Sequence, residues 1–155
     1  MKRKVFRVLL IAALIVAVAA LCGCGSHKAE CRILSAEFVD TIPMNGGIQV
    51  KYEGKSIFKV QFSATLAEAF SADGAKGDDF RKAVYSHIND GCKLTFDGGE
   101  GEQVWGYWPE KASQYSATQM TLFYTVPEGT EASALTFTLD GSVLGDAEYL
   151  FSCNP

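Results

Sequence analysis

The side chains with the most distinctive chemistry in this sequence are its cysteines, and three of them are spread through the body of the chain: Cys31, Cys92 and Cys153. Their spacing contains no CxxC pair and no zinc-binding pattern. Three thiols in an oxidising compartment allow one disulfide and leave one thiol over. Cys92 is in phase with Leu94, and Cys153 with Phe151, so both are expected to point inward from strands. We predict a Cys92–Cys153 disulfide, with Cys31–Cys153 as the alternative.

Catalytic chemistry has little support in the sequence. The only histidines are His27 and His87, and no adjacent base is evident for Cys31 or for another unpaired thiol. The sequence lacks a Gly-x-Ser-x-Gly elbow, a His-Glu-x-x-His pair, a phosphate-binding loop and a dinucleotide-binding fingerprint. Carboxylates gather in residues 73–79 and 97–102, but neither group matches an EF-hand loop. We therefore predict no enzyme, no cofactor and no metal site.

The densest aromatic group is Trp105-Gly106-Tyr107-Trp108. On a strand, Trp105 and Tyr107 share one face and Trp108 lies on the other. If exposed, these rings could stack on a sugar or hold a partner protein, because aromatic side chains are enriched at interfaces. Gly106 would let a ligand approach the backbone closely. If buried, the rings would simply belong to the core, so Trp105, Tyr107 and Trp108 are a candidate binding surface that depends on exposure.

The N-terminus combines a basic start with an uninterrupted apolar run. The basic residues are Lys2, Arg3, Lys4 and Arg7. About 14 residues, 8–21, then follow without a charge or a proline. A membrane-spanning helix needs roughly 20 apolar residues, whereas this order and length fit a secretory signal peptide. We expect a signal-peptide helix within residues 1–23.

The segment Leu21-Cys22-Gly23-Cys24 resembles the lipobox of bacterial lipoproteins, which is an aliphatic residue, a tolerant position, a small residue and a cysteine. The resemblance implies a diacylglyceryl group on the Cys24 sulfur and cleavage between Gly23 and Cys24. Cys22 fits the pattern less well, since Leu21 precedes it directly and Ala19 lies three positions before it. Acyl chains such as palmitate would hold the protein on the extracytoplasmic face of the cell membrane, or of the outer membrane in a cell that has one.

Cleavage would leave about 130 residues, which is the length of one domain. The full chain has a net charge of −4, and losing its four N-terminal bases would bring the mature chain to about −8. An acidic domain outside the membrane argues against nucleic acid as a partner.

Alternating apolar and polar residues predict about eight short strands in residues 31–155, after a tether of residues 24–30. The expected strands are 31–39, 48–52, 57–66, 92–97, 102–108, 118–126, 135–139 and 149–153. Strands 92–97 and 102–108 are expected to form a hairpin. The spacing of apolar residues changes once: Phe80, Val84 and Ile88 are four residues apart. This spacing predicts a short helix over 79–89. This pattern is typical of an all-β sandwich.

The section from Met120 to Gly129 also resembles the telokin-like, immunoglobulin-like domains of many bacterial lipoproteins. In those domains an apolar strand ends in Val-Pro-Glu, and the next strand, here Leu135-Thr136-Phe137, ends the sandwich. The resemblance implies an immunoglobulin-like β-sandwich on the outer surface, with the short inserted helix as a departure, and it implies no settled chemistry.

These observations favour a non-enzymatic lipoprotein whose domain binds an envelope protein or a glycan. The alternative is a structural accessory subunit of a cell-envelope complex, which would dock through the aromatic strand. Exposure of Trp105, Tyr107 and Trp108 would favour these binding roles, and burial of all three would weaken them.

Replacing the lipobox cysteine tests the anchor. Cys24→Ala removes the acceptor sulfur, so we expect the protein to leave the membrane fraction or to accumulate as the uncleaved precursor. Two acyl chains are needed for stable anchoring, because each buried CH₂ contributes only about 0.8 kcal/mol. Alkaline washing of membranes and the mass of the protein measure the outcome. A Cys24→Ala protein that is still cleaved and still sediments with washed membranes would exclude this anchor.

Overall fold

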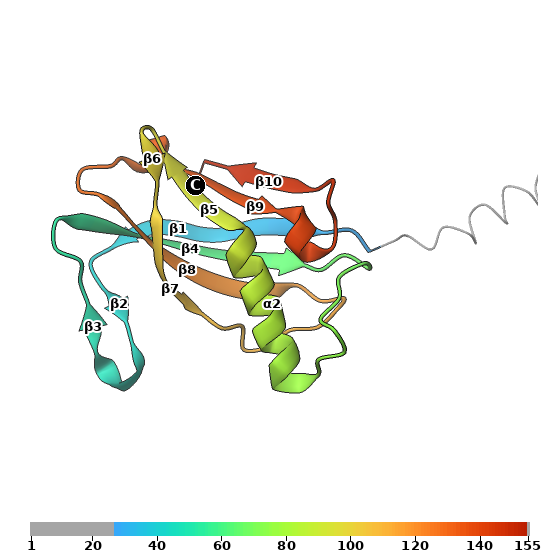
Figure 1. Cartoon of the computed structure of the whole chain (residues 1–155). Helices are drawn as coiled ribbons and strands as arrows, with labels where there is room; N and C mark the ends of the chain where they lie inside the picture. The colour runs from blue at the N-terminus through green and yellow to red at the C-terminus, as the bar shows by residue number, and fades with distance from the viewer. Residues whose placement is uncertain (1–26, 155) are drawn as a thin grey trace, which may run out of the picture.

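The longest strand among the described residues, β4 (Lys55–Thr65), lies in the interior of a four-stranded antiparallel sheet (Figure 1). The structure is a computed structural model that describes residues 27–154, so the expected signal peptide and Cys22, Gly23 and Cys24 lie outside it. The strand order of this long sheet is β1 (Glu30–Val39), β4, β8 (Thr118–Pro127) and β7 (Glu102–Tyr107). β4 pairs with β8 along almost its whole length, from Lys55 opposite Pro127 to Ala64 opposite Thr118.

A second sheet of shorter antiparallel strands packs on the first. Its order is β10 (Leu150–Cys153), β9 (Thr136–Asp140), β5 (Cys92–Phe96) and β6 (Gly99–Glu100). The short 3-10 helices η2 (Ala132–Ala134) and η3 (Gly141–Leu144) precede and follow β9. The predicted strands are present with bounds that agree within two residues.

The predicted hairpin between residues 92–97 and 102–108 is wrong. β5 turns back into the two-residue β6, and the chain then crosses to the long sheet, where β7 pairs with β8. Gly101 makes the crossing: its N–H donates to the Leu94 carbonyl oxygen at 2.7 Å. A Cβ at Gly101 would lie 3.2 Å from Val126, so this close passage between the sheets favours a glycine.

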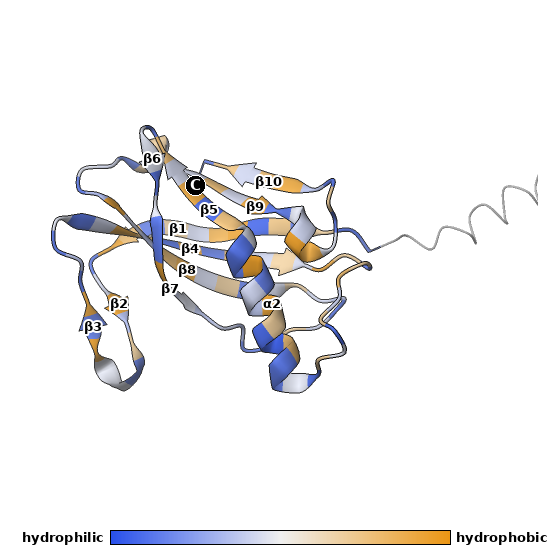
Figure 2. Cartoon of the chain, in the orientation of Figure 1, coloured by the Kyte–Doolittle hydropathy of each residue, from blue (hydrophilic) through white to orange (hydrophobic). Residues whose placement is uncertain are grey.

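The two sheets enclose the main apolar core, which confirms the expected all-β sandwich. The buried inner side chains of β4 and β8 are Phe58, Val60, Phe62, Ala64, Met120, Leu122, Tyr124 and Val126. Phe137 of β9 faces them, with ring centroids 5.3 Å from Phe62, 6.5 Å from Tyr124 and 6.5 Å from Phe151. Figure 2 shows hydrophobic and hydrophilic residues alternating along strands such as β9, as expected where one strand face is buried.

The helix α2 (Gly77–Gly91) runs directly into β5 and extends the predicted helix by two residues at each end. Its first turn carries Asp78 and Asp79, whose negative charges interact favourably with the helix dipole. Val84 and Ile88 are fully buried in the main core. α2 thus covers a part of the long sheet that the shorter strands leave open (Figure 1). Within residues 27–154, no helix combines the length and apolar character needed to cross a membrane.

The outer face of the long sheet carries a second, smaller apolar cluster. Ile57 and Phe123 are buried there against Ile42 of β2 (Ile42–Pro43). β2 pairs with β3 (Gln49–Val50) on either side of η1 (Asn45–Gly47), and we call this projecting hairpin the β2–β3 arm (Figure 1). The Tyr107 hydroxyl donates a hydrogen bond to the Pro43 carbonyl oxygen, which ties the arm to β7.

Truncating Phe137 tests the packing between the sheets. Phe137→Ala should lower the free energy of unfolding by about 3–5 kcal/mol, because it leaves a cavity among three aromatic rings. Leu150→Ala on the neighbouring β10 is the control: its side chain is 69% exposed, so the change should stay within about 0.5 kcal/mol. Urea unfolding followed by circular dichroism measures both values. Equal effects of the two substitutions would contradict this core.

Candidate functional site

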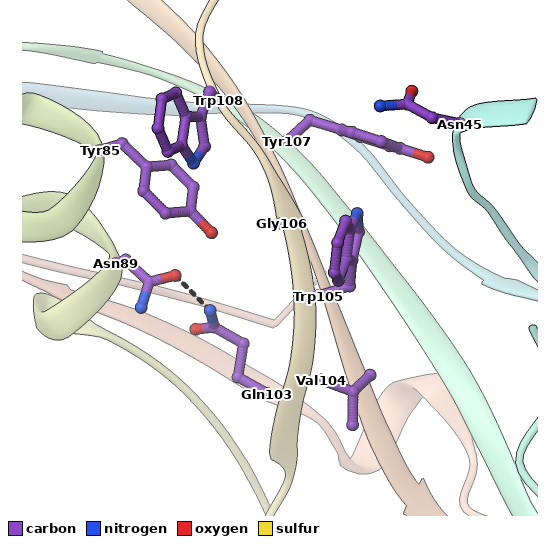
Figure 3. A pocket seen from close by; sticks show the side chains of 9 residues that line it. All are labelled: Asn45, Tyr85, Asn89, Gln103, Val104, Trp105, Gly106, Tyr107 and Trp108. Atoms are coloured by element: carbon purple, nitrogen blue, oxygen red, sulfur yellow. Dashed lines mark hydrogen bonds between the residues drawn. The ribbon is translucent and has the colours of Figure 1, made fainter. Parts of the chain in front are cut away.

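An open hollow of about 480 Å³ lies along the outer strand β7 (Figure 3). Six consecutive residues, 103–108, line it, together with Tyr85 and Asn89 of α2 and Asn45 of the β2–β3 arm. We call this hollow the β7 groove. Its walls thus come from three segments that are far apart in the sequence.

The three residues of the predicted binding surface all line the β7 groove. Trp105 is 40% exposed and Trp108 is 50% exposed, whereas Tyr107 is half-buried. Tyr107 packs edge-on against Phe123, with ring centroids 5.6 Å apart. Trp105 and Tyr107 lie on one side of β7 and Trp108 lies on the other, as the strand phase predicts (Figure 3). The structure therefore brings the three rings together and leaves two of them accessible.

Tyr85 and Trp108 form the wall on the α2 side. Their ring centroids are 6.0 Å apart, and the Lys82 Nζ lies 5.6 Å from the centre of the Trp108 ring, within cation–π range. The Tyr85 hydroxyl lies against Gly106: an added Cβ would be 2.6 Å from it and 2.8 Å from Leu122. A side chain at position 106 would therefore displace its neighbours. Burial raises the pKa of Tyr85.

A β-bulge at Val104 sets the direction of the side chains along β7. Gln103 pairs with Tyr124, but Trp105 pairs with the next residue, Phe123, so Val104 is the extra residue. The bulge lets Gln103 point toward α2, where its Nε2 donates a hydrogen bond to the Asn89 Oδ1, while Trp105 lies on the opposite side (Figure 3). In a regular strand these two side chains would share a face.

The lining of the β7 groove is aromatic and polar but uncharged. Its nine residues include four aromatic rings and three amide side chains, and none of them carries a charge. The lining contains no nucleophile paired with a base, so the arrangement can stack on a neutral ligand and hydrogen-bond to it.

The two histidines make other contacts. The His27 ring packs against Tyr115, with centroids 4.7 Å apart. His87 Nδ1–H donates to the Ala83 carbonyl oxygen at 2.7 Å, and its ring meets Phe70 at 5.5 Å. None of these contacts places a carboxylate or a thiol beside an imidazole.

Four of the six carboxylates in residues 73–79 and 97–102 form ion pairs with basic side chains. The pairs are Asp78–Arg81 at 3.0 Å, Asp79–Lys82 at 3.8 Å, Glu100–Lys93 at 3.9 Å and Glu102–Lys55 at 2.8 Å. The hydrogen bond from Lys55 lowers the pKa of Glu102. In the described part of the chain, no group of three or more His, Cys, Asp or Glu side chains could hold a metal ion.

Cys31, Cys92 and Cys153 are free cysteines in the structure, so neither the predicted Cys92–Cys153 disulfide nor its alternative, Cys31–Cys153, is seen. Cys92 is buried and the other two are half-buried, and all three contact the main core. Burial raises the pKa of the Cys31 thiol to about 12, and the neighbouring Cys153 adds to this rise. Burial also raises the pKa of Cys92, to which Cys31 contributes, and that of Cys153.

Five lining residues were not found from the sequence: Asn45, Tyr85, Asn89, Gln103 and Val104. Tyr85 and Asn89 are four positions apart on α2, so the predicted helix already implied that they share a face. What the sequence does not show is that this face lies beside β7.

Comparisons with protein-family models, with curated proteins and with solved structures give no match for this chain. Its functional class must therefore be argued from the sandwich, the β7 groove and the sequence.

The raised thiol pKa of Cys31 predicts a loss of stability in alkali. Above pH 9.0, the ordinary thiol pKa, the unfolded chain ionises at Cys31 while the folded chain keeps that proton up to about pH 12. The free energy of unfolding should therefore fall as the pH rises from 9 toward 12, and fall less steeply in Cys31→Ala. Urea unfolding at several pH values measures both slopes. Thiolate absorbance at 240 nm from all three cysteines in the native protein near pH 9 would contradict the burial of these thiols.

Proposed function

We propose that the protein is a lipoprotein held on the extracytoplasmic face of a membrane by a diacylglyceryl group on Cys24, and that its β-sandwich is a non-enzymatic binding domain. The observation that carries the binding role is the exposure of Trp105, on the outer strand β7, and of Trp108, directly after it. They are the only two tryptophans in the chain. Both border one uncharged groove.

Exposed tryptophans at one site support binding on physical grounds. Covering a large, water-exposed aromatic ring with a partner lowers the free energy of the complex. Tryptophan and tyrosine are enriched at interfaces for this reason. Trp108 has already lost some mobility, because Tyr85 packs beside it and Lys82 lies over its ring. A pre-ordered aromatic anchor loses less conformational entropy when a partner binds.

The anchor supports the same location. Basic residues, an apolar run and a lipobox-like Cys24 occur in this order at the N-terminus. The first strand begins at Glu30, and Ala29 is already buried, so only a short segment would separate Cys24 from the folded domain. Such a tether would keep the domain close to the lipid surface. Cys22→Ala is the matched control for Cys24→Ala and should leave anchoring unchanged.

Two finer assignments belong to this proposal. The sandwich is an immunoglobulin-like domain of the kind found on bacterial lipoproteins. An oxidising compartment outside the cytoplasm would also permit a disulfide among Cys31, Cys92 and Cys153. Counting thiols in guanidinium distinguishes one free thiol from three.

Removing the two tryptophans tests the binding role. The double variant Trp105→Ala, Trp108→Ala should lose its envelope partner, because truncating central aromatic anchors typically costs more than about 2 kcal/mol of binding free energy. Cross-linking on intact cells, followed by capture of the lipidated protein, measures which partners remain. Leu150→Ala, which removes an exposed apolar side chain from β10, is the control and should keep the partner. Identical partners for the double variant and the native protein would contradict a binding role for the β7 groove.

A further inference from the structure

The strand β7 is the outermost strand of the long sheet. It pairs with β8 through one of its edges. Among residues 27–154, no strand pairs with its other edge. An edge of this kind presents backbone N–H and C=O groups that a further strand can pair with. The six residues of β7 make this edge about 20 Å long, at roughly 3.4 Å per residue.

The β7 groove lies along this free edge. Successive side chains of a strand point to opposite faces, so a hollow on one face would be lined by alternate residues. The β7 groove is instead lined by six consecutive residues, 103–108. Consecutive residues can border one hollow only where the hollow runs beside the backbone itself. Its floor is therefore the unpaired backbone edge of β7.

The two walls of the groove suit a strand as the occupant. Tyr85 and Trp108 lie on one side of β7, and Trp105 and Tyr107 lie on the other (Figure 3). A strand added to the edge would present alternate side chains to each side, so each wall would meet every second residue. Gly106 lies between the walls, and its missing side chain makes room for the Tyr85 hydroxyl beside β7.

We propose that the free edge of β7 binds an extended peptide segment by strand addition, and that this segment carries uncharged side chains where it meets the four rings. This inference rests on the proposed binding function and names its ligand class. Main-chain hydrogen bonds to β7 hold the segment, and the two aromatic walls select its side chains. The uncharged lining sets the preference, because a charged side chain would lose hydration among the rings, and the one cation beside them, Lys82, already lies over the Trp108 ring.

A glycan and a second copy of this chain are the two competing occupants. A glycan would stack on the rings but would make no use of the free backbone edge that forms the floor. A second copy would have to align two bulged strands, one from each copy, whereas a flexible peptide has to adapt to the single bulge at Val104. Both alternatives give different results in the experiment below.

Four capped hexapeptides test the proposal, each with threonine alternating with valine, leucine, phenylalanine or tyrosine. The probe signal is tryptophan fluorescence, since both tryptophans of the chain border the groove. At least one peptide should bind and shift the emission. Trp105→Ala and Trp108→Ala each keep one reporter, and each should weaken binding about tenfold or more. Leu150→Ala, on the edge strand of the other sheet, should bind like the native protein.

Backbone pairing is tested separately from side-chain contact. Alternate amides of a bound strand face β7, and the others face solvent. N-methylation of the amides that face β7 removes their donors and should abolish binding. N-methylation of the other set should leave the affinity within about threefold. Bound peptide should also slow the hydrogen exchange of backbone amides in β7. Equal affinities for the two methylated peptides would overturn strand addition even if the unmodified peptide binds.

The remaining outcomes also decide the question. Failure of all four peptides to bind overturns the proposal, as does tryptophan quenching by cellohexaose without quenching by any peptide. A dimer in sedimentation velocity that Trp105→Ala dissociates would assign the edge to a second copy. If the peptides fail while the tryptophan double variant still loses its cross-linked partner, the binding function stands and only strand addition is wrong.

Discussion

The arrangement of this protein follows from a mismatch in length between its two sheets. β4 has eleven residues and spans about 37 Å, whereas β5 and β9 have five residues each and span about 17 Å. The inner row of β4 is apolar well beyond the reach of the shorter strands. This surface must be covered, since exposed apolar area costs roughly 25 cal/mol per Å². The helix α2 provides the second cover.

The position of α2 in turn creates the candidate site. Val84 and Ile88 fix the helix on the core, and Tyr85, the next residue after Val84, is then directed to the edge of the sheet against Gly106. On the outer face, the β2–β3 arm covers Ile57 and Phe123 and places Asn45 at the other border of the groove. Two elements that complete the burial of apolar surface therefore also form the walls beside β7. The groove is a by-product of how the long sheet is covered.

The local elements could be predicted from the sequence, but the pairing between them could not. The alternation in β4 and the four-residue period of α2 each depend on burial of one face, and that signal lies within a single segment. The hairpin prediction for β5 and β7 failed because two adjacent strands and a glycine-rich turn do not determine whether the chain stays in one sheet. The crossing at Gly101 depends on contacts with Leu94 and Val126 that only the folded chain supplies. The groove was missed for the same reason, although its aromatic residues were found.

The side of the sandwich where β1 and β10 lie determines where the fold can open locally. These are the outer strands of the two sheets on the side away from β7, and in residues 27–154 no connection crosses between them. One hydrogen bond, from the Cys31 N–H to the Tyr149 hydroxyl at 2.7 Å, links the start of β1 to the residue before β10. β10 pairs through only four residues with β9. Transient detachment of β10 from β9 would break these four pairings and uncover Cys153, which neighbours Cys31. Local detachment of this one short strand, without global unfolding, is therefore a route by which solvent gains further access to these half-buried sulfurs.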